Sequence, residues 1–330
     1  MLCLEKLLNG CGNVNTNELL KKSEYDFLRE NPDLRDVIYL TLSGSHGYGT
    51  NNENSDCDLR GVLIEDRKYL FGFKTFEQFE ELSTDTVIYG LKKFVRLCSE
   101  ANPNALELLG TEEDCIAIMT ERGKQLRGNS ELFLSRRVIN SFGNYATAQL
   151  RRLQNALCHD SYEEQDKVKH LRNSLNAQLE HFRRTYTSFD NGAIKIYSDN
   201  DVLKFDINLK EYPISDFAGI YSELSNTIKT YNKLNHRNNK KDDAHLYKHA
   251  MHLIRLLITG TDILNGKGII TKRRDEHDFL MDVRNGKYSF EEIFRFADEY
   301  QAKFEKAAEN TKLPYMPDIE KIENFLMGLY

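Results

Sequence analysis

Short apolar runs alternate with polar loops over roughly the first third of the chain, a pattern typical of the strands of a sheet. Asp36–Ser43 is rich in β-branched and aromatic residues and predicts a buried strand. A loop rich in Gly, Asn and Ser follows over Gly44–Ser55, and a second strand is predicted over Asp56–Ile64. Phe79 and Glu81 mark a third strand further along the chain.

Helical spacing of apolar residues dominates the rest of the sequence. Three helices are predicted beside the strands: Thr16–Arg29, Thr86–Glu100 and Ala105–Leu109. Longer helices are predicted further on: Ser135–Cys158, Glu163–Thr187, Ser215–Lys233, Asp242–Asn265 and Ser289–Ala308. One interruption predicts a hairpin that turns at Asp199 and Asn200.

This change of pattern predicts an α+β protein with two domains. A length of 330 residues accommodates two domains of ordinary size. We expect a mixed-sheet catalytic domain over residues 1–125 and a mostly helical domain over residues 126–330 that binds substrate or nucleotide. The helical domain would carry the short hairpin near residues 192–208.

Composition narrows the class of protein. A hydrophobic content of 40% is enough for a buried core, and 19 Gly and 5 Pro are too few for a fibrous or disordered chain. A net charge of −6 excludes a uniformly basic protein that coats nucleic acid, but it allows a local basic face. The 6 cysteines include no CxxC pair, so we expect reduced thiols rather than a zinc ribbon. The sequence shows neither a signal peptide nor a membrane span, and we expect a cytoplasmic protein without a membrane partner.

The chemistry is concentrated between Leu42 and Gly61. The first strand leads into Gly44 and Ser45, where glycine allows a ligand to approach the backbone closely and a serine hydroxyl with neighbouring amides can hold phosphate oxygens. Asp56 and Asp58 lie two residues apart on the second predicted strand, so both carboxylates would share one face beside this turn.

Paired carboxylates indicate a cation. Two ionised carboxylates side by side repel each other unless a cation lies between them, and Mg²⁺ is the hard cation that also takes phosphate oxygens. A third carboxylate would complete a two-metal arrangement, and Asp85 is the candidate, with Glu81 as the alternative. Taken alone, either the glycine turn or the acidic pair is compatible with an ordinary surface loop, whereas the two in this order favour a site.

Several motifs together resemble a known family. Gly44-Ser45 followed by Ser55-Asp56-Cys57-Asp58 is similar to the signature of the DNA polymerase beta superfamily of nucleotidyltransferases. More specific similarity comes from further motifs: Leu59-Arg60-Gly61, Tyr89-Gly90-Leu91-Lys92-Lys93-Phe94, Asn102-Pro103-Asn104, Tyr145-Ala146, Gln149-Leu150, Lys248-His249-Ala250-Met251-His252-Leu253 and Arg255-Leu256-Leu257. Over roughly residues 40–292 the chain resembles the predicted nucleotidyltransferases that are associated with RNA ligases in bacteria and phages.

The resemblance implies a polymerase-beta-like mixed-sheet domain with a helical companion. It implies transfer of a nucleoside monophosphate from a nucleoside triphosphate (NTP) to an acceptor hydroxyl, with Mg²⁺ or Mn²⁺ and with release of pyrophosphate. Gly44, Ser45 and Ser55 would then bind the nucleotide, Asp56 and Asp58 would bind metal, and Asp85 would be the third carboxylate. RNA, either a tRNA or an RNA 3′ end, is the expected acceptor, and an RNA ligase is an expected partner.

Basic residues supply further candidates for binding the nucleotide. Arg60 follows Asp58 by two residues and would reach a phosphate or pair with a carboxylate. His245, His249 and His252 share one helix face, which is compatible with zinc, with a face toward phosphate or RNA, or with packing inside the helical domain. The second interpretation adds Lys248 and Arg255 from the same helix to the nucleotide-binding residues.

Other functions stay open from the sequence. Basic residues between 121 and 187 (Arg151, Arg152, Arg172, Arg183 and Arg184) fit an acceptor groove for RNA and equally a charged helical surface. The same fold would also serve nucleotidyl transfer to a protein or to a small molecule. A nucleotide- or RNA-binding module without catalysis and a metal-dependent phosphohydrolase are the remaining alternatives. If the chain is phage-encoded, its cytoplasmic location would be that of the host.

Overall fold

The computed structural model describes residues 16–52, 55–161, 171–172, 175–176, 178–180, 182–183, 186, 189–190, 192–199, 202–234 and 243–330. The chain divides into two compact units, one formed by Met1–Ala148 together with Tyr247–Tyr330 and the other by Gln149–Leu246. This division differs from the expected boundary between residues 125 and 126. That boundary falls inside the first unit, because the chain returns to this unit at Tyr247.

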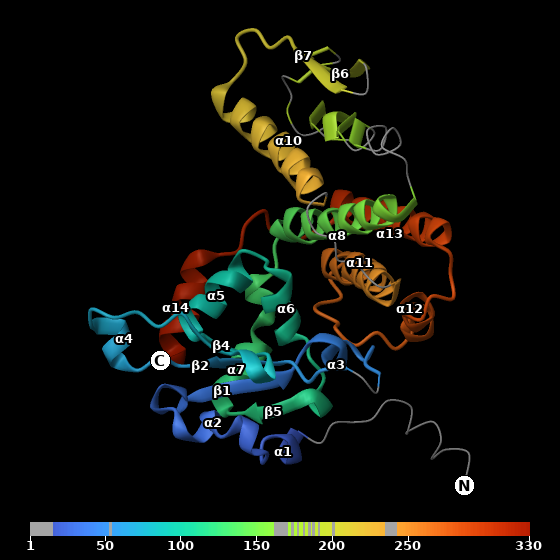
Figure 1. Ribbon diagram of the computed structural model, residues 1–330. Helices are drawn as coiled ribbons and strands as arrows, with labels where there is room; N and C mark the ends of the chain where they lie inside the picture. The colour runs from blue at the N-terminus through green and yellow to red at the C-terminus, as the bar shows by residue number, and fades with distance from the viewer. Residues whose placement is uncertain are drawn as a thin grey trace. The chain divides into compact units, whose positions relative to one another are not determined.

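A five-stranded mixed sheet organises the described part of the first unit (Figure 1). Its strands lie in the order β3-β4-β2-β1-β5: β3 (Gln78–Glu81), β4 (Thr86–Gly90), β2 (Leu59–Leu63), β1 (Val37–Leu42) and β5 (Ile116–Met119). The strands β2 and β4 run parallel, while the neighbouring pairs β1–β2, β1–β5 and β3–β4 are antiparallel. The predicted strand at residues 36–43 is confirmed as β1, whereas the second strand begins three residues later than expected, at Leu59.

The expected helix over Thr86–Glu100 is wrong in its first third. Thr86–Gly90 is the strand β4, and the helix α5 begins only at Leu91 and ends at Ser99. Thr86 and Ile88 are fully buried where β4 pairs with β2, and β-branched side chains of this kind pack well on a sheet. This segment therefore forms a strand paired with β2, although its apolar residues have helical spacing.

The expected helix over Thr16–Arg29 is also corrected. It is broken into α1 (Thr16–Leu19), a 3₁₀ turn at Ser23–Tyr25 and α2 (Phe27–Glu30), and a further 3₁₀ turn follows at Pro32–Leu34. Leu19 and Tyr25 are both buried in the core beside the sheet. Six residues of continuous helix would rotate one of them by 240° from the other, so the break allows both side chains to reach the core.

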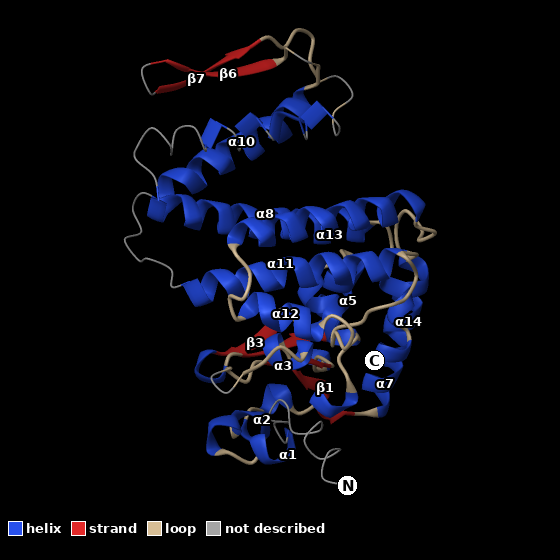
Figure 2. Cartoon of the chain, turned by 90° about the vertical axis from the view of Figure 1, so that its right-hand side faces the viewer, coloured by secondary structure: helices blue, strands red, loops and turns tan. Residues whose placement is uncertain are grey.

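The described part of the first unit also contains further short helices. They are α3 (Gly44–Tyr48), α4 (Arg67–Phe71), α6 (Pro103–Leu109), α7 (Glu121–Gly128), α12 (His277–Arg284) and α14 (Ile319–Leu329). The predicted helix at residues 105–109 is confirmed within α6. In both views α5 and α14 lie on the side of the sheet opposite α1 and α2 (Figures 1 and 2).

Four long helices match the helical pattern to within three residues at each end. They are α8 (Arg137–Ser161), α10 (Ile214–Leu234), α11 (Asp243–Leu264) and α13 (Phe290–Asn310). The predicted helix at residues 163–187 falls largely outside the described residues.

In the first unit, a Cβ on Gly260 of α11 would lie 2.6 Å from the Phe304 ring of α13 and 3.3 Å from Phe142 of α8, so glycine is what allows these helices to approach. Among the described helices, none combines the length and hydropathy needed to cross a membrane.

The second unit has a small core of its own. The strands β6 (Ile194–Asp199) and β7 (Val202–Ile207) form an antiparallel pair where the hairpin was predicted, although Asn200 of the predicted turn lies outside the described residues. Ile194 and Ile220 are buried together with Phe182. The mixed sheet followed by mostly helical segments confirms the predicted α+β class.

Candidate active site

The turn after β1 and the acidic segment before β2 lie against each other. The Ser43 amide donates to the Asp58 carbonyl over 2.8 Å. Gly44 has a φ of 57°, in the left-handed region that favours glycine, and a Cβ at this position would overlap Oδ2 of Asp58. The Asp58 carboxyl group therefore packs directly on the Gly44 backbone, and Ser45 is buried one residue further on.

Asp85 lies beside Asp58 because β2 and β4 are parallel neighbours. Leu59 pairs with Thr86 at the start of the two strands, so the residues before them, Asp58 and Asp85, meet at the same end of the sheet. Burial raises the pKa of the Asp58 carboxyl to about 6, and a hydrogen bond to Asp85 and the negative charge of Asp85 act in the same direction. The two carboxyl groups are thus close enough to disfavour a second negative charge.

Arg60 contacts Asp85 rather than the glycine turn. Its Nη2 lies 2.9 Å from Oδ1 of Asp85, and its Nη1 donates to the Asp85 carbonyl and, over 2.9 Å, to the Leu59 carbonyl. The positive charge of Arg60 partly offsets the rise in the pKa of Asp58. That Arg60 binds the nucleotide stays a prediction.

Glu81, the alternative third carboxylate, is engaged elsewhere. Its Oε1 accepts hydrogen bonds from the backbone amide of Ser83 over 3.2 Å and from the Ser83 hydroxyl over 2.8 Å. These two hydrogen bonds lower the pKa of Glu81. Of the two candidates, Asp85 is therefore the one that the structure brings beside Asp58.

Asp56 and Ser55 lie in irregular chain before β2. Asp56 is exposed, and since β2 starts only at Leu59, regular strand alternation does not bring its carboxylate to the face of Asp58. The Ser55 hydroxyl is held within the loop: it accepts from the Asn52 amide over 2.9 Å and donates to Asn52 Oδ1 over 3.0 Å. Within the parts of the chain that the structure describes, no group of three or more His, Cys, Asp and Glu side chains is placed to hold a metal ion. A metal site on three carboxylates therefore stays a prediction, and the three histidines do not form a zinc site among the described residues.

Arg284 reaches the same loop from the far end of the sequence. Its guanidinium donates to the Thr50 carbonyl and lies 3.4 Å from the Ser55 hydroxyl. The contact joins α12 to the loop that connects the glycine turn with Asp56. Sequence reasoning missed Arg284, because no local motif marks a contact across 229 residues.

Arg255 lies in a buried ion pair. Both of its terminal nitrogens donate to the Glu107 carboxylate, and the Tyr48 hydroxyl donates to the same carboxylate over 2.8 Å. The Arg255 guanidinium stacks 3.5 Å from the centre of the Tyr48 ring. Burial alone would lower the pKa of Arg255, but the Glu107 charge leaves it raised. These contacts join α3 to α6 and α11. Glu107 lies inside the apolar run of residues 105–109, and this position in the sequence is a signal that could have marked it as a buried ion-pair partner.

Lys248 and His252, also on α11, differ from Arg255 in their exposure to solvent. Lys248 is exposed, and His252 is half-buried with its ring centre 6.0 Å from that of Tyr48. Burial lowers the pKa of His252 well below its usual range, and the positive charges of Arg255 and Lys248 lower it further, so the ring is neutral at neutral pH. Nucleotide binding by Lys248 and Arg255 stays a prediction.

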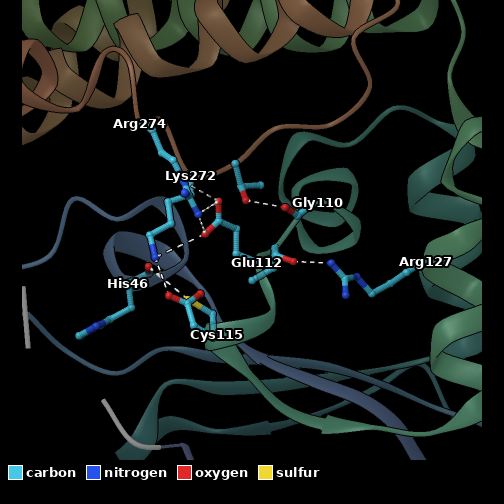
Figure 3. Close-up of polar contacts among 10 residues, drawn as sticks. His46, Gly110, Glu112, Cys115, Arg127, Lys272 and Arg274 are labelled. Carbon is cyan, nitrogen blue, oxygen red and sulfur yellow. Dashed lines mark hydrogen bonds and ion pairs between the residues drawn. The ribbon is translucent and has the colours of Figure 1, made fainter. Parts of the chain in front are cut away.

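A cluster of ion pairs joins the segment at residues 272–274 to the segment at residues 112–114 (Figure 3). Lys272 Nζ lies 2.7 Å from Asp114 Oδ2, and Arg274 Nη2 donates to Glu112 over 3.0 Å. The aliphatic part of Lys272 packs on Gly49, the residue that ends α3. The segment at residues 272–274 therefore contacts both the chain after α6 and the residue that ends α3.

In the second unit, two of the basic residues expected to form a groove are half-buried or paired with a carboxylate. Burial lowers the pKa of Arg151, against the effect of Glu223, and Arg183 is paired with Glu180. The side chains of Arg152 and Arg184 lie outside the described residues. An acceptor groove on this unit stays a prediction.

The mixed five-stranded sheet followed by helices is consistent with a polymerase-beta-like domain. Residues 18–170 match the sequence model of the RNA repair pathway DNA polymerase beta family, and this segment contains all five strands of the sheet. The match confirms the resemblance to the polymerase beta superfamily that the motifs predicted. Neither the curated proteins nor the solved structures contain a significant match to the chain.

Proposed function

We propose that this protein is a Mg²⁺-dependent nucleotidyltransferase that transfers a nucleoside monophosphate from an NTP to a hydroxyl of RNA. The observation that supports this proposal is the Asp58 carboxyl group packed on the Gly44 backbone with Asp85 beside it. This juxtaposition joins a backbone turn suited to phosphate with two carboxylates suited to a hard cation.

The residues present fit a divalent cation. Asp58 and Asp85 offer hard oxygen donors. Burial first, and Asp85 second, raise the pKa of Asp58, and a cation held between the two carboxylates would favour its ionised form. We propose that Asp58 and Asp85 hold Mg²⁺ (or Mn²⁺) and that Asp56, exposed two residues before Asp58, joins them when substrate is bound. The ion would neutralise charge on the triphosphate and acidify the acceptor hydroxyl.

The residues of the chain would divide the remaining work. Gly44 and Ser45 would hold the triphosphate, with Ser55 and the exposed Lys248 as further contacts. Asp85 would take the proton of the acceptor hydroxyl as its oxygen bonds to the α-phosphorus and the bond from that phosphorus to pyrophosphate breaks. Arg255 would act indirectly, since Glu107 holds its guanidinium and Tyr48 links the pair to α3.

RNA is the acceptor that the family match favours. The description of that family names an RNA repair pathway, and we extend it to this chain as an RNA substrate and an RNA ligase partner. Transfer to a tRNA or to an RNA 3′ end releases the same pyrophosphate, so the acceptor must be identified separately from the reaction.

The proposal is tested by incubating the protein with Mg²⁺, each α-labelled NTP and total RNA. We expect label in RNA, one pyrophosphate released per nucleotide added, and loss of both in Asp58→Asn and Asp85→Asn. Asp36→Asn is the matched control, because Asp36 is an exposed carboxylate whose partner is Arg122 at 3.4 Å. Label on protein or on a small molecule would replace RNA as the acceptor, and label that is unchanged in Asp58→Asn would refute the proposal.

A further inference from the structure

Arg60 uses its guanidinium to bridge the two parallel strands where they begin. Nη1 donates to the Leu59 carbonyl of β2 and to the Asp85 carbonyl that precedes β4, and Nη2 binds Oδ1 of Asp85. The side chain of Arg60 is 22% exposed, whereas that of Asp85 is 62% exposed. Arg60 thus contacts the backbone and the side chain of one residue at once, while that carboxylate stays open to solvent.

Asp85 needs such support because its backbone is strained. Its φ of 41° and ψ of 47° lie in the left-handed region, which non-glycine residues adopt only at a cost. This conformation ends the 3₁₀ turn at Leu82–Thr84 and begins β4. Relaxation of Asp85 to an ordinary backbone conformation would move its carboxylate relative to Asp58, the residue that precedes the neighbouring strand β2.

We infer that Arg60 is a positioning residue, which holds Asp85 in its left-handed conformation and aims its carboxylate at Asp58, rather than a ligand of the nucleotide. The inference rests on the proposed function, since it assigns Arg60 a role in building the two-carboxylate site. Arginine suits this role because its planar guanidinium can reach a carbonyl and a carboxylate together, whereas the ammonium of lysine acts as a single point charge.

Arg127, in the same unit, provides a matched control for a substitution of Arg60. Arg127 on α7 repeats the contacts of Arg60: it donates to two carbonyls, those of Leu109 and Thr111, and its Nη1 lies 2.9 Å from Oε1 of Glu113. The exposed fractions of this pair are 19% and 85%, close to those of Arg60 and Asp85. Arg127→Lys therefore removes the same kinds of contact as Arg60→Lys, at an ion pair that includes neither Asp58 nor Asp85.

The test compares the wild-type protein, Arg60→Lys and Arg127→Lys. Both substitutions keep the charge, so a difference between them reports geometry. We expect Arg60→Lys to lower kcat for transfer by roughly 10–100-fold with little change in the KM for NTP, as when other residues that orient metal ligands are removed. We expect Mn²⁺ binding, followed by electron paramagnetic resonance, to weaken about tenfold in Arg60→Lys and to stay unchanged in Arg127→Lys.

Two further results would overturn the inference. A raised KM for NTP at unchanged kcat would make Arg60 a nucleotide ligand, and equal effects of the two substitutions would make its role merely structural. If the wild-type protein transfers no nucleotide, the proposed function fails, while Mn²⁺ binding still decides the role of Arg60. Hydrogen exchange over residues 82–89 supplies an independent measurement, because the amides that follow Asp85 should exchange faster in Arg60→Lys only.

Discussion

The proximity of Asp58 to Asp85 predicts that Asp58→Asn stabilises the protein while it abolishes transfer. Burial first, and Asp85 second, raise the pKa of Asp58 from 3.8 to about 6, so its ionised form is less favourable in the folded than in the unfolded chain. Asparagine keeps the shape of the side chain, carries no charge, and has an amide that donates to the Asp85 carboxylate.

The magnitude follows from the size of the pKa shift. A rise from 3.8 to about 6 corresponds to roughly 3 kcal/mol at about 1.36 kcal/mol per pH unit. Because Asp58 is only half-buried, solvent screening reduces this to on the order of 1–2 kcal/mol. At about 2–4 °C per kcal/mol for a unit of this size, the gain in Tm would be about 2–8 °C.

The gain in stability from Asp58→Asn depends on pH. Below about pH 3.8 the carboxyl is protonated in both states and the substitution changes nothing, while above about pH 6 the full penalty is present in the wild-type protein. Thermal unfolding in EDTA, followed by circular dichroism from about pH 4 to about pH 8, should therefore show a gain that grows with pH. Asp36→Asn should stay within about 0.5 kcal/mol of wild type. An Asp58→Asn protein that is less stable near neutral pH, or equally stabilised near pH 4, would refute the reasoning.

Three further predictions concern the same unit. Glu107→Gln should lower the free energy of unfolding by about 3–5 kcal/mol in denaturant titrations, because it leaves the buried Arg255 charge unpaired, and the double variant with Arg255→Met should recover most of the loss. Gly44→Ala should reduce transfer by about 100-fold or more and cost about 1–2 kcal/mol in stability, because its φ is 57° and its Cβ would displace the Asp58 carboxylate. At subsaturating Mg²⁺, kcat/KM for transfer should fall about tenfold per pH unit below about pH 6, since Asp58 must be ionised; a flat profile from about pH 5 to about pH 8 would contradict this.

The sequence revealed the parts of the candidate site that are encoded locally. Gly44 and Asp58 are 14 positions apart, and the order of glycine turn, loop and acidic pair could be recognised without knowing the fold. Asp85 lies beside Asp58 in the structure, while its role as the third carboxylate stays a prediction, and the segment after it is a strand rather than the expected helix. Its position depends on the parallel pairing of β2 with β4, which the spacing of apolar residues does not report.

Contacts between distant segments could not be predicted. Arg255 pairs with Glu107, which lies 148 positions earlier in the sequence, and the pattern along its own helix indicates only a basic residue on one face. Arg284 was missed for the same reason. The expected domain boundary assumed that the chain does not return to its first domain, whereas residues 247–330 belong to the unit that holds the sheet.

Anomalous diffraction from crystals grown with Mn²⁺ and a non-hydrolysable NTP analogue would test the central claim most directly. The account predicts a Mn²⁺ peak between the carboxylates of Asp58 and Asp85, with the triphosphate on the backbone of Gly44 and Ser45. A triphosphate bound away from that turn, or a Mn²⁺ ion that touches neither aspartate, would contradict it.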